Sequence, residues 1–94
     1  MSSLTAPVTL LSAVTATGAS TAVQADAGQP AFLQAVGITT ATVAFQGSLD
    51  GTTYATIGTA LTADGIVTIA NAPKYLRANV TAYTSGTITV KVLY

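Results

Sequence analysis

The fold is decided by the stretch Val43-Ala-Phe-Gln-Gly-Ser-Leu-Asp-Gly-Thr-Thr-Tyr-Ala-Thr-Ile57. Its first four residues alternate between large apolar and small or polar side chains, the period-2 pattern of a half-buried strand. Residues 47–52 read as a turn, because Ser and Asp side chains hydrogen-bond nearby backbone N–H groups and glycine tolerates a positive φ. We therefore expect a β-hairpin in which Asp50 and Gly51 build the turn and residues 54–57 return as the second strand.

Alternation along the rest of the chain predicts further strands. They are expected at residues 8–11, 20–24, 32–36, 66–70, 75–83 and 87–94. Asp64 and Gly65 are expected to form a second structural turn, and residues 84–86 should turn the chain between the last two strands. About seven or eight short strands with regular turn signals indicate an all-β fold, an antiparallel β-sandwich of the jelly-roll or Ig-like kind.

The composition excludes several classes of function. The 94 residues make one domain and include no cysteine and no histidine, so disulfides, thiolate metal sites and histidine general bases are ruled out. Charged residues make up 6% of the chain, against about 25% in typical soluble domains, and the net charge is zero. Nothing here attracts nucleic acid electrostatically. Either Thr and Ser keep the surface hydrated, or much of that surface is buried in an assembly, where charged side chains are depleted.

The first 28 residues are rich in Ala, Thr, Ser and Val and precede a turn-like segment. Residues 1–28 are interpreted as an N-terminal arm or as the first strands, and residues 29–94 as the β-sandwich body. The candidate partner contacts in this tract are Leu4, Pro7, Val8, Leu10 and Leu11. The first Lys or Arg is Lys74, so a secretory signal is not expected. No run approaches the roughly 18 apolar residues of a membrane span.

Candidate chemistry is sparse. The only acids are three aspartates, Asp26, Asp50 and Asp64, and the last two sit beside glycines in expected turns, which favours a structural role over catalysis. No metal or cofactor site is expected. Arg77 lies in the middle of an expected strand. There it either makes a cross-strand hydrogen bond or serves as an anchor in a protein interface. Tyrosines in strands either line a sugar-binding face or serve packing and subunit contacts.

Two stretches carry a resemblance to a known family. The sequences VAFQGSLDGTTYATIG (43–58) and YLRANVTAYTSGTITVKV (75–92) resemble a β-sandwich module of tailed-bacteriophage virion structural proteins. In that family a strand ending in Gly-Ser-Leu-Asp-Gly-Thr-Thr precedes an aromatic residue. A later Tyr-x-Arg-x-x-Val-Thr strand leads into a Ser-Gly turn and a final strand. The likeness covers about half of the chain, from Val43 onward.

The resemblance implies a virion structural protein, most specifically a capsid decoration (cement) protein. Such a protein would sit on the capsid exterior, bind the major capsid protein across capsomers and form a homo-oligomer, with a trimer preferred. No enzyme activity, cofactor, nucleic acid or membrane is expected. The alternatives are a carbohydrate-binding β-sandwich of a tail or fibre, and a neck or tail component. An exposed aromatic platform beside amides would favour sugar binding, and a self-complementary apolar patch would favour assembly.

Overall fold

Two long strands, β4 and β7, run the length of the molecule. The computed structural model describes residues 7–25 and 27–94. Strand β4 (Ala31–Ser48) pairs antiparallel with β7 (Tyr75–Leu93), from Phe32 opposite Leu93 to Ser48 opposite Tyr75. The shorter strands are β1 (Val8–Val14), β2 (Gly18–Ala19), β3 (Val23–Gln24), β5 (Ala55–Thr56) and β6 (Gly65–Ile69).

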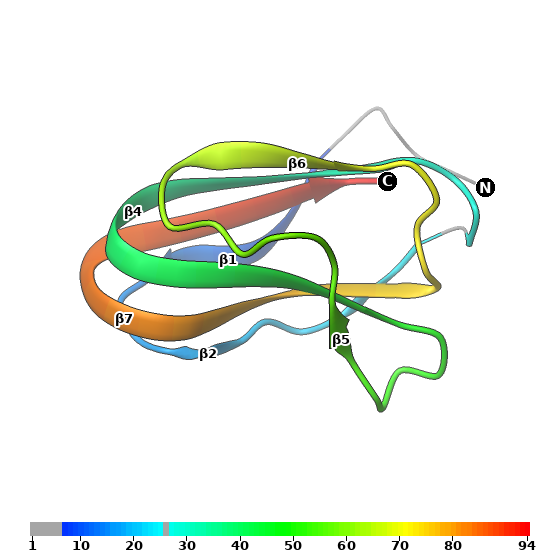
Figure 1. The fold of residues 1–94 in the computed structure, drawn as a ribbon, viewed down its shortest axis with the longest axis horizontal. Coiled ribbons are helices and arrows are strands. Elements are labelled where there is room, and N and C mark those ends of the chain that lie inside the picture. Colours follow the sequence, from blue (N-terminus) through cyan, green and yellow to red (C-terminus); the bar gives the residue numbers. More distant parts are fainter. Residues whose placement is uncertain (1–6, 26) are drawn as a thin grey trace.

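All these strands belong to one antiparallel sheet. Strands β1, β2 and β3 pair with β7, while β5 and β6 pair with β4 (Figure 1). The prediction of an all-β fold is confirmed, because no helix occurs in residues 7–25 or 27–94. In that part of the chain no helix is therefore long and apolar enough to span a membrane.

The central pair of strands bends midway, so that the sheet folds back on itself (Figure 1). The pairing of β4 with β7 shifts register several times between Val36 and Val43. Gly37 (φ 82°) and Gly86 (φ 128°) lie in this bend, and a Cβ at Gly86 would lie 2.6 Å from the Gly37 carbonyl oxygen. Only glycine permits both this backbone conformation and this close approach.

One hydrophobic core lies inside the fold and receives side chains from both halves of the bent sheet. Alternate residues of the two long strands point into it, as the period of two requires. The core residues of β4 and β7 that are at most 1% exposed are Ala31, Leu33, Ala35, Val43, Phe45, Leu76, Ala78, Val80, Ile88, Val90 and Val92. Of the alternation predicted for residues 75–83 and 87–94, the inward positions from Leu76 to Val80 and from Ile88 to Val92 are confirmed. Ala82, which was expected on the same inward face, is exposed.

Two predicted strand ends are wrong. Gly37 does not end a strand, because β4 continues through it to Ser48. The Ser85-Gly86 segment does not turn the chain, because residues 75–93 form the single strand β7 and both of its halves pair with β4. A glycine that opens a turn and a glycine that allows a bend look alike in the sequence. The long partner strand, which supplies hydrogen bonds on both sides of the bend, decides between them.

The described part of the N-terminal tract lies along β7. Val8 pairs with Val92 in β1, and β2 and β3 continue the pairing further along β7. Leu10 and Leu11 are buried in the chain's own core, whereas Val8 and Pro7 are exposed. Leu4, the remaining candidate contact in this tract, lies outside the described residues.

Candidate functional site at the hairpin end

The loop between β4 and β5 is held together by its own polar groups. The Ser48 hydroxyl donates to Asp50 Oδ1 (2.8 Å) and accepts from the backbone N–H of Asp50 (3.2 Å) and Gly51 (2.9 Å). Asp50 Oδ1 also accepts from the backbone N–H of Thr52 (2.8 Å) and Thr53 (2.9 Å). These five hydrogen bonds fix the loop conformation without any partner.

The electrostatics of this loop follow from the same bonds. Backbone N–H groups of Thr53 and Thr52, then the Ser48 hydroxyl, lower the pKa of Asp50 from 3.8 to about 2. Hydrogen bonds to the ionised form favour it, so the carboxylate is charged at any physiological pH. Its negative charge is stabilised by the N–H groups of its own loop.

The predicted turn residues occupy two different settings. Gly51 has φ 79°, and a Cβ there would lie 3.3 Å from the Tyr75 ring. Residues 46–47 pair with 55–56, so the hairpin is confirmed. Asp64 instead directly precedes β6, and its Oδ1 accepts a hydrogen bond from the Ile38 backbone N–H (2.8 Å) of the neighbouring strand β4 at the bend. Gly65 is the first residue of β6.

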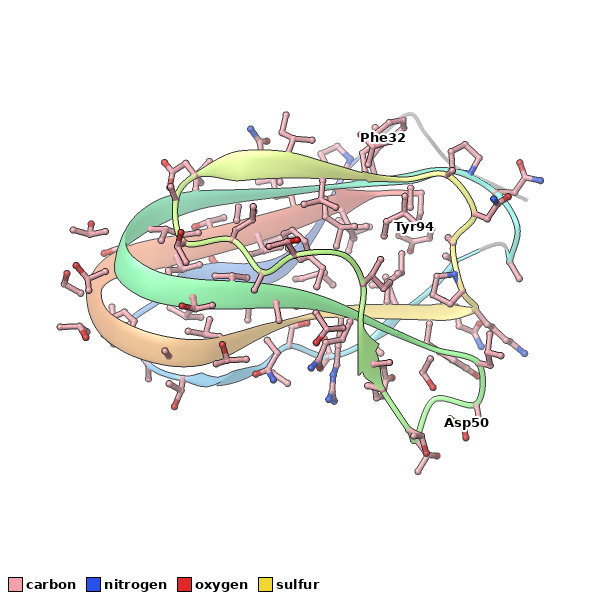
Figure 2. All side chains as sticks on the ribbon, viewed as in Figure 1. Phe32, Asp50 and Tyr94 are labelled. Carbon is pink, nitrogen blue, oxygen red and sulfur yellow. The ribbon has the colours of Figure 1, made fainter. Side chains whose placement is uncertain are left out.

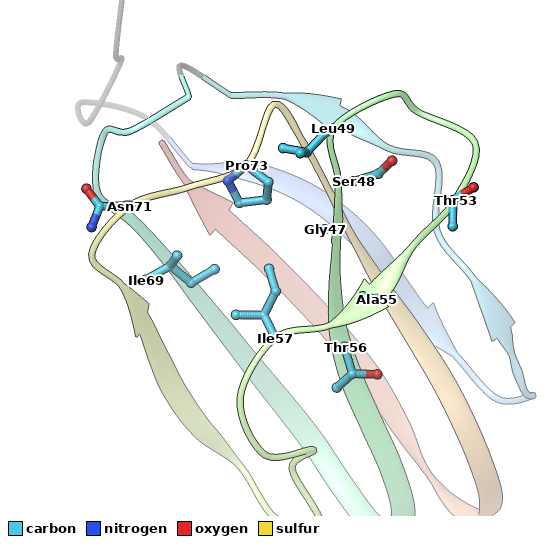
Figure 3. A pocket seen from close by; sticks show the side chains of 10 residues that line it. All are labelled: Gly47, Ser48, Leu49, Thr53, Ala55, Thr56, Ile57, Ile69, Asn71 and Pro73. Carbon is cyan, nitrogen blue, oxygen red and sulfur yellow. The ribbon is translucent and has the colours of Figure 1, made fainter.

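An apolar hollow opens beside the loop (Figure 3). Its volume is about 370 Å³, and Ile57, Ile69 and Pro73 point toward one another across it. At Gly47 a Cβ would overlap Pro73 Cγ and lie 2.8 Å from Ile57 Cδ1, so glycine lets these side chains meet. Leu49, which also lines the hollow, is 79% exposed.

A cluster around Arg77 lies on the outer face of the same end. Arg77 Nε donates to Gln46 Oε1 (2.8 Å), and the guanidinium carbon lies 3.8 Å from the centroid of the Tyr54 ring. Gln46 and Arg77 are directly opposite each other in the β4–β7 pairing. Tyr75 lies two residues before Arg77 in β7, opposite Ser48. Its hydroxyl accepts a hydrogen bond from Gln24 Nε2 (3.3 Å). The predicted cross-strand hydrogen bond of Arg77 is therefore present.

A second surface lies on the other half of the sheet. There Phe32, Ile66 and Leu93, with Pro7, line a hollow of about 400 Å³ that also contains Lys91. Ile66 is 64% exposed. Figure 2 shows Phe32 well separated from Asp50 at the loop tip. Sequence reasoning missed Leu49 and Ile66, although a large apolar residue inside a polar turn is itself a signal for Leu49.

Both described acids have structural roles, because Asp50 accepts hydrogen bonds within its loop and Asp64 accepts one at the bend. In residues 7–25 and 27–94 no three potential metal ligands come together. No protein-family model, curated protein or solved structure matches the chain. The function is therefore inferred from the geometry of the hairpin end itself.

Proposed function

We propose that the chain is a non-enzymatic structural protein of a tailed-bacteriophage virion. In this proposal it is a decoration (cement) protein on the capsid exterior that binds the major capsid protein across capsomers. The observation that carries the proposal is Leu49, which is 79% exposed on a loop fixed by five hydrogen bonds of its own. A loop that is already ordered loses little conformational entropy when a partner covers its apolar side chain.

The surroundings of Leu49 support an adhesive role. The hollow beside it has apolar walls and can receive a side chain from the partner while Leu49 enters the partner's surface. Interfaces are depleted in charged residues at their centre, and this chain carries 6% charged residues and no net charge. Adhesion across capsomers would then stabilise the shell by burying apolar surface on both sides.

A homotrimer accompanies this proposal. The apolar face around Phe32, Ile66 and Leu93 lies on the other half of the sheet from the loop, so subunits can meet there while the loop contacts the shell. Closed symmetry covers such a face without forming fibres. The core shared by the two halves of the bent sheet supports a β-sandwich as the finer description of the fold.

A carbohydrate-binding module of a tail or fibre is the second candidate. The observation in its favour is that Tyr54 and Tyr75 lie beside the amides of Gln46 and Gln24 on one face. Stacking on a sugar needs an open ring face, however, and Arg77 already covers one face of Tyr54. The adhesive function is therefore preferred.

Co-sedimentation with undecorated heads of the phage that encodes the chain tests the proposal. Leu49→Asp should melt as the wild type does, because exposed substitutions change stability by about 0.5 kcal/mol or less. It should lose binding to heads. Ile66→Asp is the matched control, since it places the same charge at another exposed apolar site; it should abolish the trimer mass in light scattering but retain direct contact with heads.

Three results would contradict these assignments. Wild-type protein that does not sediment with heads would refute the decoration function. Leu49→Asp protein that binds heads at full strength would show that the loop is not the contact. Wild-type protein that binds a glycan array and ignores heads would favour the carbohydrate-binding candidate.

A further inference from the structure

The guanidinium of Arg77 is held in place on two sides. Its Nε–H is donated to Gln46 Oε1, and one flat face lies over the Tyr54 ring. Arginine carries five N–H groups in a rigid fork, so the bond to Gln46 uses the Nε position and leaves the Nη1–Nη2 edge for another acceptor. The half-buried side chain is thus oriented before any partner arrives.

The hydrogen-bond acceptor found for this cation is neutral. The two described carboxylates act elsewhere: Asp50 accepts from Thr52 and Thr53 in its own loop, and Asp64 accepts from Ile38 at the bend. An amide satisfies the geometry of Nε–H but does not balance the positive charge. A carboxylate on the Nη1–Nη2 edge would balance the charge and would accept two parallel charge-assisted hydrogen bonds.

The position of Arg77 favours a protein as the source of that carboxylate. The Gln46–Arg77 pair is followed along β4 and β7 by the Ser48–Tyr75 pair, and the loop that contains Leu49 comes directly after Ser48. Arg77 and Leu49 therefore both lie at the hairpin end of the sheet, a charged anchor on its outer face and an exposed apolar side chain on the loop. Arginine and buried apolar anchors of this kind dominate the binding energy of protein interfaces.

We propose that Arg77 binds an Asp or Glu side chain of the partner end-on, with Gln46 and Tyr54 as positioning residues. The inference rests on the proposed function, since the partner is the shell protein. The single arginine lies in a chain of zero net charge, which suits one carboxylate better than a run of phosphates.

A charge-matched pair of variants tests the inference. In Gln46→Glu, a carboxylate enters beside Arg77 and neutralises it from within the chain. The matched control is Gln34→Glu, because Gln34 lies opposite Lys91 in the same strand pair and gives the same net charge. Gln46→Glu should fold and melt at least as well as the wild type and bind heads roughly tenfold more weakly. Gln34→Glu should bind as the wild type does.

Equal binding by the wild type and Gln46→Glu would overturn the proposal, and so would an equal loss in both variants. Failure of the wild type to bind heads would instead count against the proposed function. A second measurement then tests independently whether Arg77 binds a carboxylate. The Nε–H resonance of the single arginine in labelled protein should shift saturably with sodium glutarate, but not with sodium chloride or dimethyl glutarate, and not in Gln46→Glu. The proposal that Arg77 binds a protein carboxylate would be refuted by the lack of a saturable shift in the wild type, or by tighter binding of glucuronate than of glutarate.

Discussion

Replacing Gly37 with alanine tests why the central strands can bend. Gly37 has φ 82° and Gly28 has φ 85°, so alanine is strained at both positions. A Cβ at Gly37 would overlap the Thr87 carbonyl oxygen and lie 2.8 Å from the Thr87 carbonyl carbon, whereas a Cβ at Gly28 would meet nothing within 4 Å. Gly28→Ala is therefore a matched control that carries the backbone strain without the overlap.

The expected magnitudes separate the two variants. Alanine at positive φ costs about 1–2 kcal/mol, which is the expected loss of unfolding free energy for Gly28→Ala. The overlap in Gly37→Ala forces β4 and β7 apart and adds a penalty of the size seen for overpacking, about 1–3 kcal/mol. Each 1 kcal/mol lowers the melting temperature of a domain this size by about 4–8 °C. Urea and thermal unfolding followed by circular dichroism measure both losses. Equal losses would show that the close approach of Gly37 to Thr87 does not require glycine.

Two further predictions concern the described aspartates. The folded-state pKa of Asp50 is lowered to about 2 from 3.8, so its contribution to stability is complete above pH 3.8 and is lost as the pH falls toward about 2. Unfolding midpoints should fall more steeply across this window for the wild type than for Asp50→Asn, and parallel curves would contradict this. Asp64→Ala removes the acceptor of the exposed Ile38 N–H at the bend, where water can replace it, and should destabilise the fold by about 0.5–1.5 kcal/mol in urea unfolding. Asp64→Asn, which keeps an acceptor oxygen, should recover most of that loss; an equally unstable Asp64→Asn would show that the charge matters instead.

Local chemistry made part of the fold predictable. The hairpin follows from Ser48, Asp50 and Gly51, whose side-chain and backbone preferences act within a few residues of one another. The inward face of β7 follows from the alternation of residues 76–80 and 88–92. Both features depend on short-range rules, and the structure has both.

The bend could not be predicted, because it depends on partners far apart in the chain. Gly86 pairs with Ile38, and the Ile38 N–H is bound by Asp64, which is 26 residues away. In the sequence, Ser85-Gly86 has the composition of a turn. Leu10 and Leu11 were candidate contacts for the same reason: their burial follows from pairing with β7, which begins more than 60 residues later.

Only part of the candidate site could be predicted from the sequence. Arg77 stood out as a charge in the middle of an alternating strand, and its hydrogen bond to Gln46 was one of the expected alternatives. The stacking on Tyr54 depends on the register that places β5 beside β4 and β4 beside β7. The sequence places Leu49 only within the turn motif, because a turn motif does not reveal which of its side chains the loop turns toward solvent.

Electron cryomicroscopy of undecorated heads, imaged before and after addition of the purified protein, tests directly whether the protein decorates the capsid. We expect added density on the capsid exterior, across capsomer junctions, with the loop containing Leu49 at the contact with the shell. Heads that look the same with and without the protein, or added density confined to the tail, would contradict it.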